Sequence, residues 1–137
     1  MFCFSYNILI MQTLLVIALG GATGAIMRFL MSELVYKITG VLFPWATLVV
    51  NLTGCFLIGL LWGIFDRFNF GNNAKIFVFT GFLGAYTTFS TFAMENFYLI
   101  KNGNFSLLAL NVSISNIAGI LLVFAGVYVA KLLAYKY

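Results

Sequence analysis

Histidine is absent from this chain of 137 residues, and cysteine occurs only twice, as Cys3 and Cys55. Two cysteines so far apart, one near the start of the chain and one inside an apolar run, do not indicate a disulfide framework. They also form no cluster that could bind a transition metal, and no histidine is present to activate a nucleophile. The sequence therefore predicts neither a transition-metal site nor an enzyme.

Charged side chains are scarce as well. They make up 7% of the chain, whereas soluble domains carry about 25%. Hydrophobic residues make up 64%, so the chain cannot cover itself with polar surface. Its net charge of +4 comes from scattered basic residues. This distribution favours contact with lipid headgroups over nucleic-acid binding.

Long apolar segments are what the chain does have. Residues 1–27, 38–65, 76–94 and 102–130 carry no Lys, Arg, Asp or Glu, and each is long enough for one membrane span of about 20 residues. We therefore predict an all-α integral membrane protein, multi-pass, with a single membrane domain over residues 1–137. The predicted transmembrane helices cover about residues 14–35, 45–65, 75–99 and 106–133. Residues 1–12 are interpreted as an N-terminal extension, and a start at Met1 or at Met11 fits the sequence equally well.

The basic residues give little orientation signal. Four spans place both termini on one side of the membrane, and the basic residues on the two sides are nearly balanced. The terminal side receives Arg67, Lys75, Lys131 and Lys136, and the opposite side receives Arg28, Lys37 and Lys101. Because topology follows the Lys and Arg bias, this balance predicts insertion in both orientations and pairing of two antiparallel copies. A single orientation set by Arg28 or by the N-terminal amine is the alternative.

The third predicted helix contains a stretch, residues 84–92, that is rich in Gly and in hydroxylated or β-branched residues. Such residues lower helix propensity and are compatible with a helix broken near mid-membrane, although composition alone favours an unbroken helix that packs closely through its small residues. An opened turn is tolerated there only if it is buried in protein or lines a polar cavity. The main-chain carbonyls of Gly84 and Thr87 could then bind a cation such as Na⁺. Close helix packing through small residues is the alternative.

Two aromatic residues follow in the same stretch. Phe89 and Phe92 are three residues apart and so share a helix face, with the hydroxyls of Ser90 and Thr91 beside them. The edge of an aromatic ring is electropositive and can hold an anion without a full positive charge. Because the chain contains 16 Phe residues, ordinary packing or lipid contact is also compatible with this pair.

Polar residues of the second and fourth helices could complete an anion path. Asn51 lies inside the second predicted helix, and its amide can donate two hydrogen bonds to an anion. In the fourth, Asn111, Ser115 and Gly119 recur every four residues and form one stripe. Each polar member could instead hydrogen-bond a neighbouring helix. Two further polar residues of the fourth helix fall on a different face and are assigned to packing: Ser113 and Asn116.

Three segments resemble the Fluc (CrcB) family of fluoride channels: residues 24–28 (GAIMR), 47–54 (TLVVNLTG) and 87–92 (TTFSTF), the last followed by Glu95. The resemblance covers about residues 20–133. It implies a fluoride-selective ion channel in the bacterial inner membrane that passively exports cytoplasmic fluoride. It also implies a third helix broken at mid-membrane, and an antiparallel, dual-topology homodimer with two antiparallel pores and a structural Na⁺ at the dimer interface.

The resemblance also implies roles for individual residues. Gly84 and Thr87 match the residues whose backbone carbonyls hold the Na⁺, and Phe89 and Phe92 match the pair that contacts fluoride. Arg28 and Glu95 lie near span ends, where charged side chains can snorkel or line a vestibule. The family pattern assigns the vestibule to Arg28. It assigns the polar pore lining to Asn51, Ser90, Thr91, Ser115 and Glu95.

The chain departs from the family pattern beside these positions. Ala85 stands where a second Gly is usual, Tyr86 where Phe or Leu is common, and Asn111 where Tyr is common, which leaves the coordination at the ends of the path open. The alternative function is a small dual-topology multidrug or cation exporter. Such an exporter needs an acidic residue deep in its first helix, and this chain offers only Glu33 near the end of that helix. An identical partner chain and a related second subunit both remain compatible with the sequence.

Overall fold

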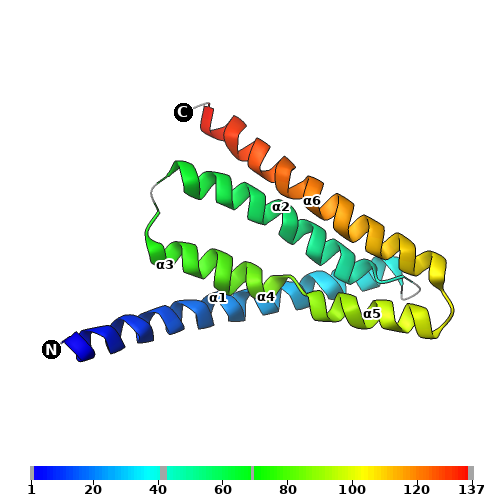
Figure 1. The fold of residues 1–137 in the computed structure, drawn as a ribbon, viewed down its shortest axis with the longest axis horizontal. Helices are drawn as coiled ribbons and strands as arrows, with labels where there is room; N and C mark the ends of the chain where they lie inside the picture. Colours follow the sequence, from blue (N-terminus) through cyan, green and yellow to red (C-terminus); the bar gives the residue numbers. More distant parts are fainter. Residues whose placement is uncertain (1, 41–42, 69, 136–137) are drawn as a thin grey trace.

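The computed structural model describes residues 2–40, 43–68 and 70–135, and every regular element in these ranges is a helix (Figure 1). Three long helices and one composite segment make up the chain. The elements in order are α1 (Phe2–Thr39), α2 (Trp45–Arg67), α3 (Asn72–Lys75), the π-helix η1 (Ile76–Leu83), α4 (Gly84–Tyr86), α5 (Phe89–Lys101) and α6 (Phe105–Tyr135). The four short elements from α3 to α5 follow one another along a single line and form the third span.

Four segments are long and apolar enough to cross a membrane: Leu9–Thr39, Trp45–Arg67, Asn72–Lys101 and Phe105–Ala134. This confirms the predicted all-α, multi-pass membrane protein with four spans. α1 is longer than the predicted 14–35 at both ends, and it includes residues 2–12, which the sequence analysis treats as an extension. Helices longer than the roughly 20 residues that a bilayer needs either tilt or project from it.

The two ends of the bundle carry different connections. The start of α1, the end of α6 and the connection from α2 to α3 lie towards one end in Figure 1. The connections from α1 to α2 and from α5 to α6 lie towards the other end. The chain therefore returns to its starting side after four passes, as the even number of spans requires.

Glycines let α2 and α6 approach closely. A Cβ atom on Gly59 would overlap the carbonyl oxygen of Val123. A Cβ atom on Gly126 would likewise overlap the carbonyl oxygen of Phe56. Small residues that bring backbones into contact are a common basis of helix association in membranes, where lipid is as apolar as any side chain. α2 and α6 thus pack backbone against backbone.

The same device joins α1 to the first half of the third span. A Cβ atom on Gly24 would overlap the carbonyl oxygen of Phe82, and a Cβ on Gly81 would lie only 2.9 Å from the Cα of Gly20. The π-helical hydrogen bonding of η1 is confined to this contact region, residues 76–83. Helix packing therefore fixes the segment that leads directly into the interruption of the third span.

The third helix is broken, as predicted, at two residues in the middle of its span. Thr87 has φ −78° and ψ 156°, and Thr88 has φ −147° and ψ 114°, both extended conformations. Residues Gly84–Tyr86 are still helical, so Ala85 continues the helix and the chain opens only after Tyr86. β-Branched threonine accepts extended backbone readily, which is compatible with an opening at the threonine pair.

Candidate functional site

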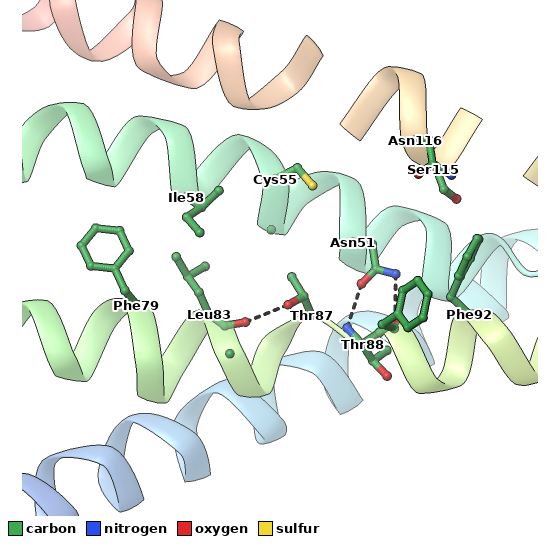
Figure 2. A pocket seen from close by; sticks show the side chains of 13 residues that line it. Asn51, Cys55, Ile58, Phe79, Leu83, Thr87, Thr88, Phe92, Ser115 and Asn116 are labelled. Carbon is green, nitrogen blue, oxygen red and sulfur yellow. Dashed lines mark hydrogen bonds between the residues drawn. The ribbon is translucent and has the colours of Figure 1, made fainter. Parts of the chain in front are cut away.

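Asn51 of α2 compensates the broken backbone. Its Nδ2 donates to the carbonyl oxygen of Thr88 at 3.0 Å, and its Oδ1 accepts from the Thr88 amide at 2.8 Å (Figure 2). One side chain thereby satisfies both main-chain groups of an extended residue, as a neighbouring β-strand would. An amide nitrogen carries two hydrogens, and one of them is used here. The prediction that Asn51 offers two donors to an anion therefore becomes one free donor in this structure.

Thr88 also begins the second half of the span. Its Oγ1 accepts from the Thr91 amide at 3.2 Å and donates to the Thr91 hydroxyl at 2.9 Å. A threonine in extended conformation whose hydroxyl binds the third following amide is an N-cap, which stabilises the first turn of a helix. Thr88 thus fixes where α5 starts. The sequence analysis missed this role, although a threonine just before a helical segment is a common N-cap residue.

The interruption frees main-chain carbonyls. In a continuous helix the Thr88 amide would donate to the carbonyl of Gly84, but here it donates to Asn51. Thr87 has left the helix, and Gly84 is exposed, with only the Phe79 carbonyl within 4 Å of the place of a Cβ. Main-chain oxygens at unwound helix ends suit Na⁺. The carbonyls of Gly84 and Thr87 therefore fit the expected type of cation ligand. In the described residues no group of three or more His, Cys, Asp or Glu side chains could hold a metal.

An open cavity of about 370 Å³ lies beside the interruption, between α2, the third span and α6. Figure 2 shows Asn51, Thr87, Thr88, Phe92 and Ser115 around it. Six residues that the sequence singled out line this cavity: Asn51, Gly84, Thr87, Phe89, Phe92 and Ser115. No charged side chain is among its described lining residues. The fold thus gathers polar groups and aromatic rings from three helices around an uncharged hollow.

The two phenylalanines lie at the mouth of this cavity. Their ring centroids are 5.7 Å apart and the ring planes are inclined by 42°. Phe89 is 79% exposed, whereas Phe92 is partly buried. The rings share one helix face, as their spacing predicts, and both line the cavity.

A second cavity, of about 300 Å³, shares Thr88 with the first. Arg28 and Thr91 line it, and Arg28 is the one charged residue among its described lining residues. Ser90, in contrast, is exposed and lines none of the cavities described here; its Oγ lies 3.3 Å from that of Thr88. The positive charge therefore lies beside the interruption but outside the cavity of the phenylalanines.

Glu95 lies further along α5, in the lining of a third cavity of about 600 Å³. Its Oε1 accepts from the hydroxyl of Thr47 at 2.6 Å, and its Oε2 is buried without a hydrogen-bond partner in the described part of the chain. Tyr36 lines both this cavity and that of Arg28. Apart from Ser90, the predicted site residues thus line three cavities, of which the first two share Thr88 and the last two share Tyr36.

The stripe predicted on the fourth helix divides between core and cavity. Asn111 is buried and donates through Nδ2 to Asn96 Oδ1 at 2.9 Å, while Ser115 reaches the cavity. The assignment of Asn116 to packing is wrong, because this residue is exposed and lines the same cavity as Ser115. Tyr86, noted only as a departure from a pattern, is buried and its hydroxyl lies 2.8 Å from that of Thr53.

Four apolar spans and a polar interruption inside one of them define a multi-pass membrane protein with an internal polar site. The chain belongs to the CrcB family, since the model described as "CrcB-like protein, Camphor Resistance (CrcB)" matches residues 15–127. The resemblance expected from its motifs is thereby confirmed.

Relatives of similar length carry the name "Fluoride-specific ion channel FluC". The one from Azobacteroides pseudotrichonymphae is 42% identical over 117 residues, 85% of this chain and 94% of the relative. A relative from Leptospira interrogans is 42% identical over 121 residues, 88% and 95% of the two chains. One from Dehalococcoides mccartyi is 41% identical over 125 residues, 90% and 95% of the two chains. These relatives are ion channels and not enzymes, which agrees with the absence of a catalytic constellation expected from the sequence.

Proposed function

We propose that this protein is a fluoride-selective ion channel that passively exports cytoplasmic fluoride across the bacterial inner membrane. The observation that carries the proposal is the cavity in which Asn51, Phe89, Phe92 and Ser115 meet, in a member of a family whose relatives are named for fluoride. An inside-negative membrane potential drives an anion outward without another energy source, by about 2.3 kcal/mol per charge for each 100 mV.

The lining chemistry supports a small, strongly hydrated anion. The free Nδ2 hydrogen of Asn51, the hydroxyl of Ser115 and the ring edges of Phe89 and Phe92 replace part of the hydration shell. Conduction needs binding that is weak enough to release the ion. A cavity whose described lining contains no Lys or Arg meets this need, and Arg28 in the neighbouring cavity attracts the anion from a distance.

We further propose that two antiparallel copies assemble, each completing the pore of the other, so that the dimer has two antiparallel pores. A single copy leaves Gly84 and Phe89 exposed at the interruption. Freed main-chain groups within a span are tolerated only where protein or a polar cavity covers them. The balanced basic residues of the two sides allow both orientations. In a pair of identical chains, the exposed surface of each copy can cover the same surface of the other.

The carbonyls of Gly84 and Thr87 are the proposed ligands of a structural Na⁺ at the dimer interface. Two copies meeting at their interruptions supply four such oxygens. A bound cation interacts favourably with the negative oxygen ends of the carbonyl dipoles at the centre of the interface. The Thr88 amide donates to Oδ1 of Asn51 and not to the Gly84 carbonyl, so this carbonyl is left free to bind the cation.

The first experiment measures ion efflux from liposomes that contain the purified protein. Fluoride is expected to leave much faster than chloride, and equal rates would refute the proposal. Phe89→Ile and Phe92→Ile are expected to reduce fluoride efflux at least tenfold while the protein still assembles. Phe97→Ile is the matched control, because Phe97 is an exposed phenylalanine of the same helix that lines none of the described cavities.

The second experiment replaces Na⁺ by a larger organic cation throughout purification. Loss of the dimer, or of efflux that Na⁺ restores, is the expected result. An unchanged dimer with unchanged efflux would remove the cation from the proposal and leave the pore residues unaffected. The alternative of a proton-coupled cation exporter predicts efflux of organic cations, and its acidic residue would have to be Glu33, which is exposed near the end of α1.

A further inference from the structure

A buried pair of asparagines connects α5 to α6. Asn111 is 1% exposed and Asn96 is 8% exposed. Nδ2 of Asn111 donates to Oδ1 of Asn96 at 2.9 Å. Buried polar groups inside a span need partners, and each amide here finds one in the other. This bond sets which side of the Asn111 amide faces Asn96, and the pair lies outside the three cavities described above.

The pair is linked to the proposed pore through Ser115. The hydroxyl of Ser115 donates to Oδ1 of Asn111 over 3.5 Å. This distance is longer than the usual O–H···O hydrogen bond of about 2.5–3.0 Å, so the contact is weak and the hydroxyl is easily turned. Ser115 itself lines the cavity that contains Asn51 and Phe92 (Figure 2).

The direction of the amide decides what Ser115 can offer to an ion. An asparagine side chain has a donor side and an acceptor side, and a hydroxyl has a single hydrogen. Because Asn96 accepts from the donor side of Asn111, the acceptor side is left facing Ser115. The Ser115 hydrogen then has two competing acceptors, the Asn111 carbonyl oxygen and any anion in the cavity.

We infer that Asn96 is a positioning residue that acts through Asn111 to weaken the hold of Ser115 on a passing anion. The inference rests on the proposed function, since it concerns the same cavity. Conduction requires that each site release its ion readily. A competing acceptor fixed beside a donor lowers the affinity for the anion without removing the donor. Asn96 thus tunes a site that it does not touch.

The test is the fluoride dependence of efflux from liposomes that contain the full-length protein. Asn96→Leu removes the acceptor that orients Asn111, and Asn111→Leu removes the competing oxygen itself. Both are expected to lower the half-saturating fluoride concentration about threefold, the equivalent of roughly 0.6 kcal/mol. The maximal rate falls at the same time, because release becomes slower. Ser115→Ala is expected to raise the half-saturating concentration, and in this background Asn96→Leu should have no further effect.

Ser113→Ala is the matched control, since it removes an exposed hydroxyl of α6 two residues from Ser115 and should leave both kinetic parameters unchanged. A half-saturating concentration that is unchanged or raised in Asn96→Leu overturns the inference, as does a shift that persists without the Ser115 hydroxyl. The inference is also overturned if neither leucine variant assembles, because the pair is then purely structural. If the unmodified protein fails to conduct fluoride, the proposed function itself fails.

Discussion

Where α2 meets α6, glycines bring two helix backbones into contact, and where the third span is interrupted, side chains hydrogen-bond to freed main-chain groups. At Gly59 and Gly126 the first contact is made by backbone atoms, so it depends on shape. The second depends on Asn51, Thr88 and Tyr86, each with a specific partner. Two different kinds of contact therefore stabilise this fold. Close packing makes a rigid frame, and a few polar bonds hold the extended residues of the interruption in one conformation beside that frame.

The largest effect is expected from removing the polar support of the interruption. Asn51→Leu leaves both the amide and the carbonyl of Thr88 without their partner. Both groups are part-buried, and each unsatisfied group costs about 1–3 kcal/mol, so the loss of folding free energy should be about 4 kcal/mol. Thermal unfolding in detergent measures the loss, and fluoride efflux should disappear.

Asn116→Leu is the matched control for this change. Among the described residues Asn116 bonds only to the Val112 carbonyl of its own helix, so the same substitution should change stability by less than about 0.5 kcal/mol. Equal destabilisation in the two variants would show that Asn51 contributes nothing special to the interruption.

The next largest effect is expected in the glycine contact. Gly59→Ala places a methyl group against the carbonyl oxygen of Val123. Neither backbone can yield without separating α2 from α6, so the cost should reach about 3 kcal/mol, the upper end for overpacking. Gly21→Ala is the control. A Cβ atom on Gly21 would meet no atom within 4 Å beyond the neighbouring backbone of its own helix. The substitution should be neutral or stabilising by up to about 1 kcal/mol, because alanine favours a helix. Similar melting temperatures for both variants would contradict the assignment of α2 and α6 as a rigid frame.

Much of this division was visible in the sequence. The four spans follow from charge-free runs, whereas the break in the third helix was predicted from the family resemblance, because the poor helix formers of residues 84–92 are also compatible with close helix packing. The position of the break could not be predicted, because it depends on a partner in another helix. Oδ1 of Asn51 accepts a hydrogen bond from the Thr88 amide, so the chain opens after Tyr86 and not at Gly84. The bonds of Asn96 with Asn111 and of Thr47 with Glu95 were missed for the same reason. Each joins residues from different helices, and no spacing rule within one helix reveals it.

A third variant sharpens the difference between the two regions. Gly54 faces the side-chain methyl group of Thr87, so that Gly54→Ala also creates an overlap. Here the obstacle is a side chain and not a backbone. We expect a loss of about 2 kcal/mol that Thr87→Ser largely reverses, since serine lacks the methyl group but keeps the hydroxyl that donates to Leu83.

The corresponding second substitution in the frame should fail. Gly59→Ala combined with Val123→Ala leaves the obstructing carbonyl oxygen in place, so no recovery is expected there. Melting temperatures of the two double variants test the contrast directly. Recovery in both, or in neither, would remove the distinction between a frame held by backbone contact and an opening held by side chains.

The smallest effect is expected at Tyr86, the last helical residue before the interruption. Its ring is 3% exposed and stacks on Phe82 at 5.9 Å between centroids, while its hydroxyl lies 2.8 Å from that of Thr53. Tyr86→Phe keeps the packing and removes one hydrogen bond between helices, which is worth about 0.6 kcal/mol in a membrane protein. Thr53 retains its bonds to the carbonyls of its own helix, so no group is orphaned. Fluoride efflux should stay within twofold of the unmodified protein. A loss as large as that of Asn51→Leu would mean that the hydroxyl pair, and not the amide of Asn51, holds the interruption open.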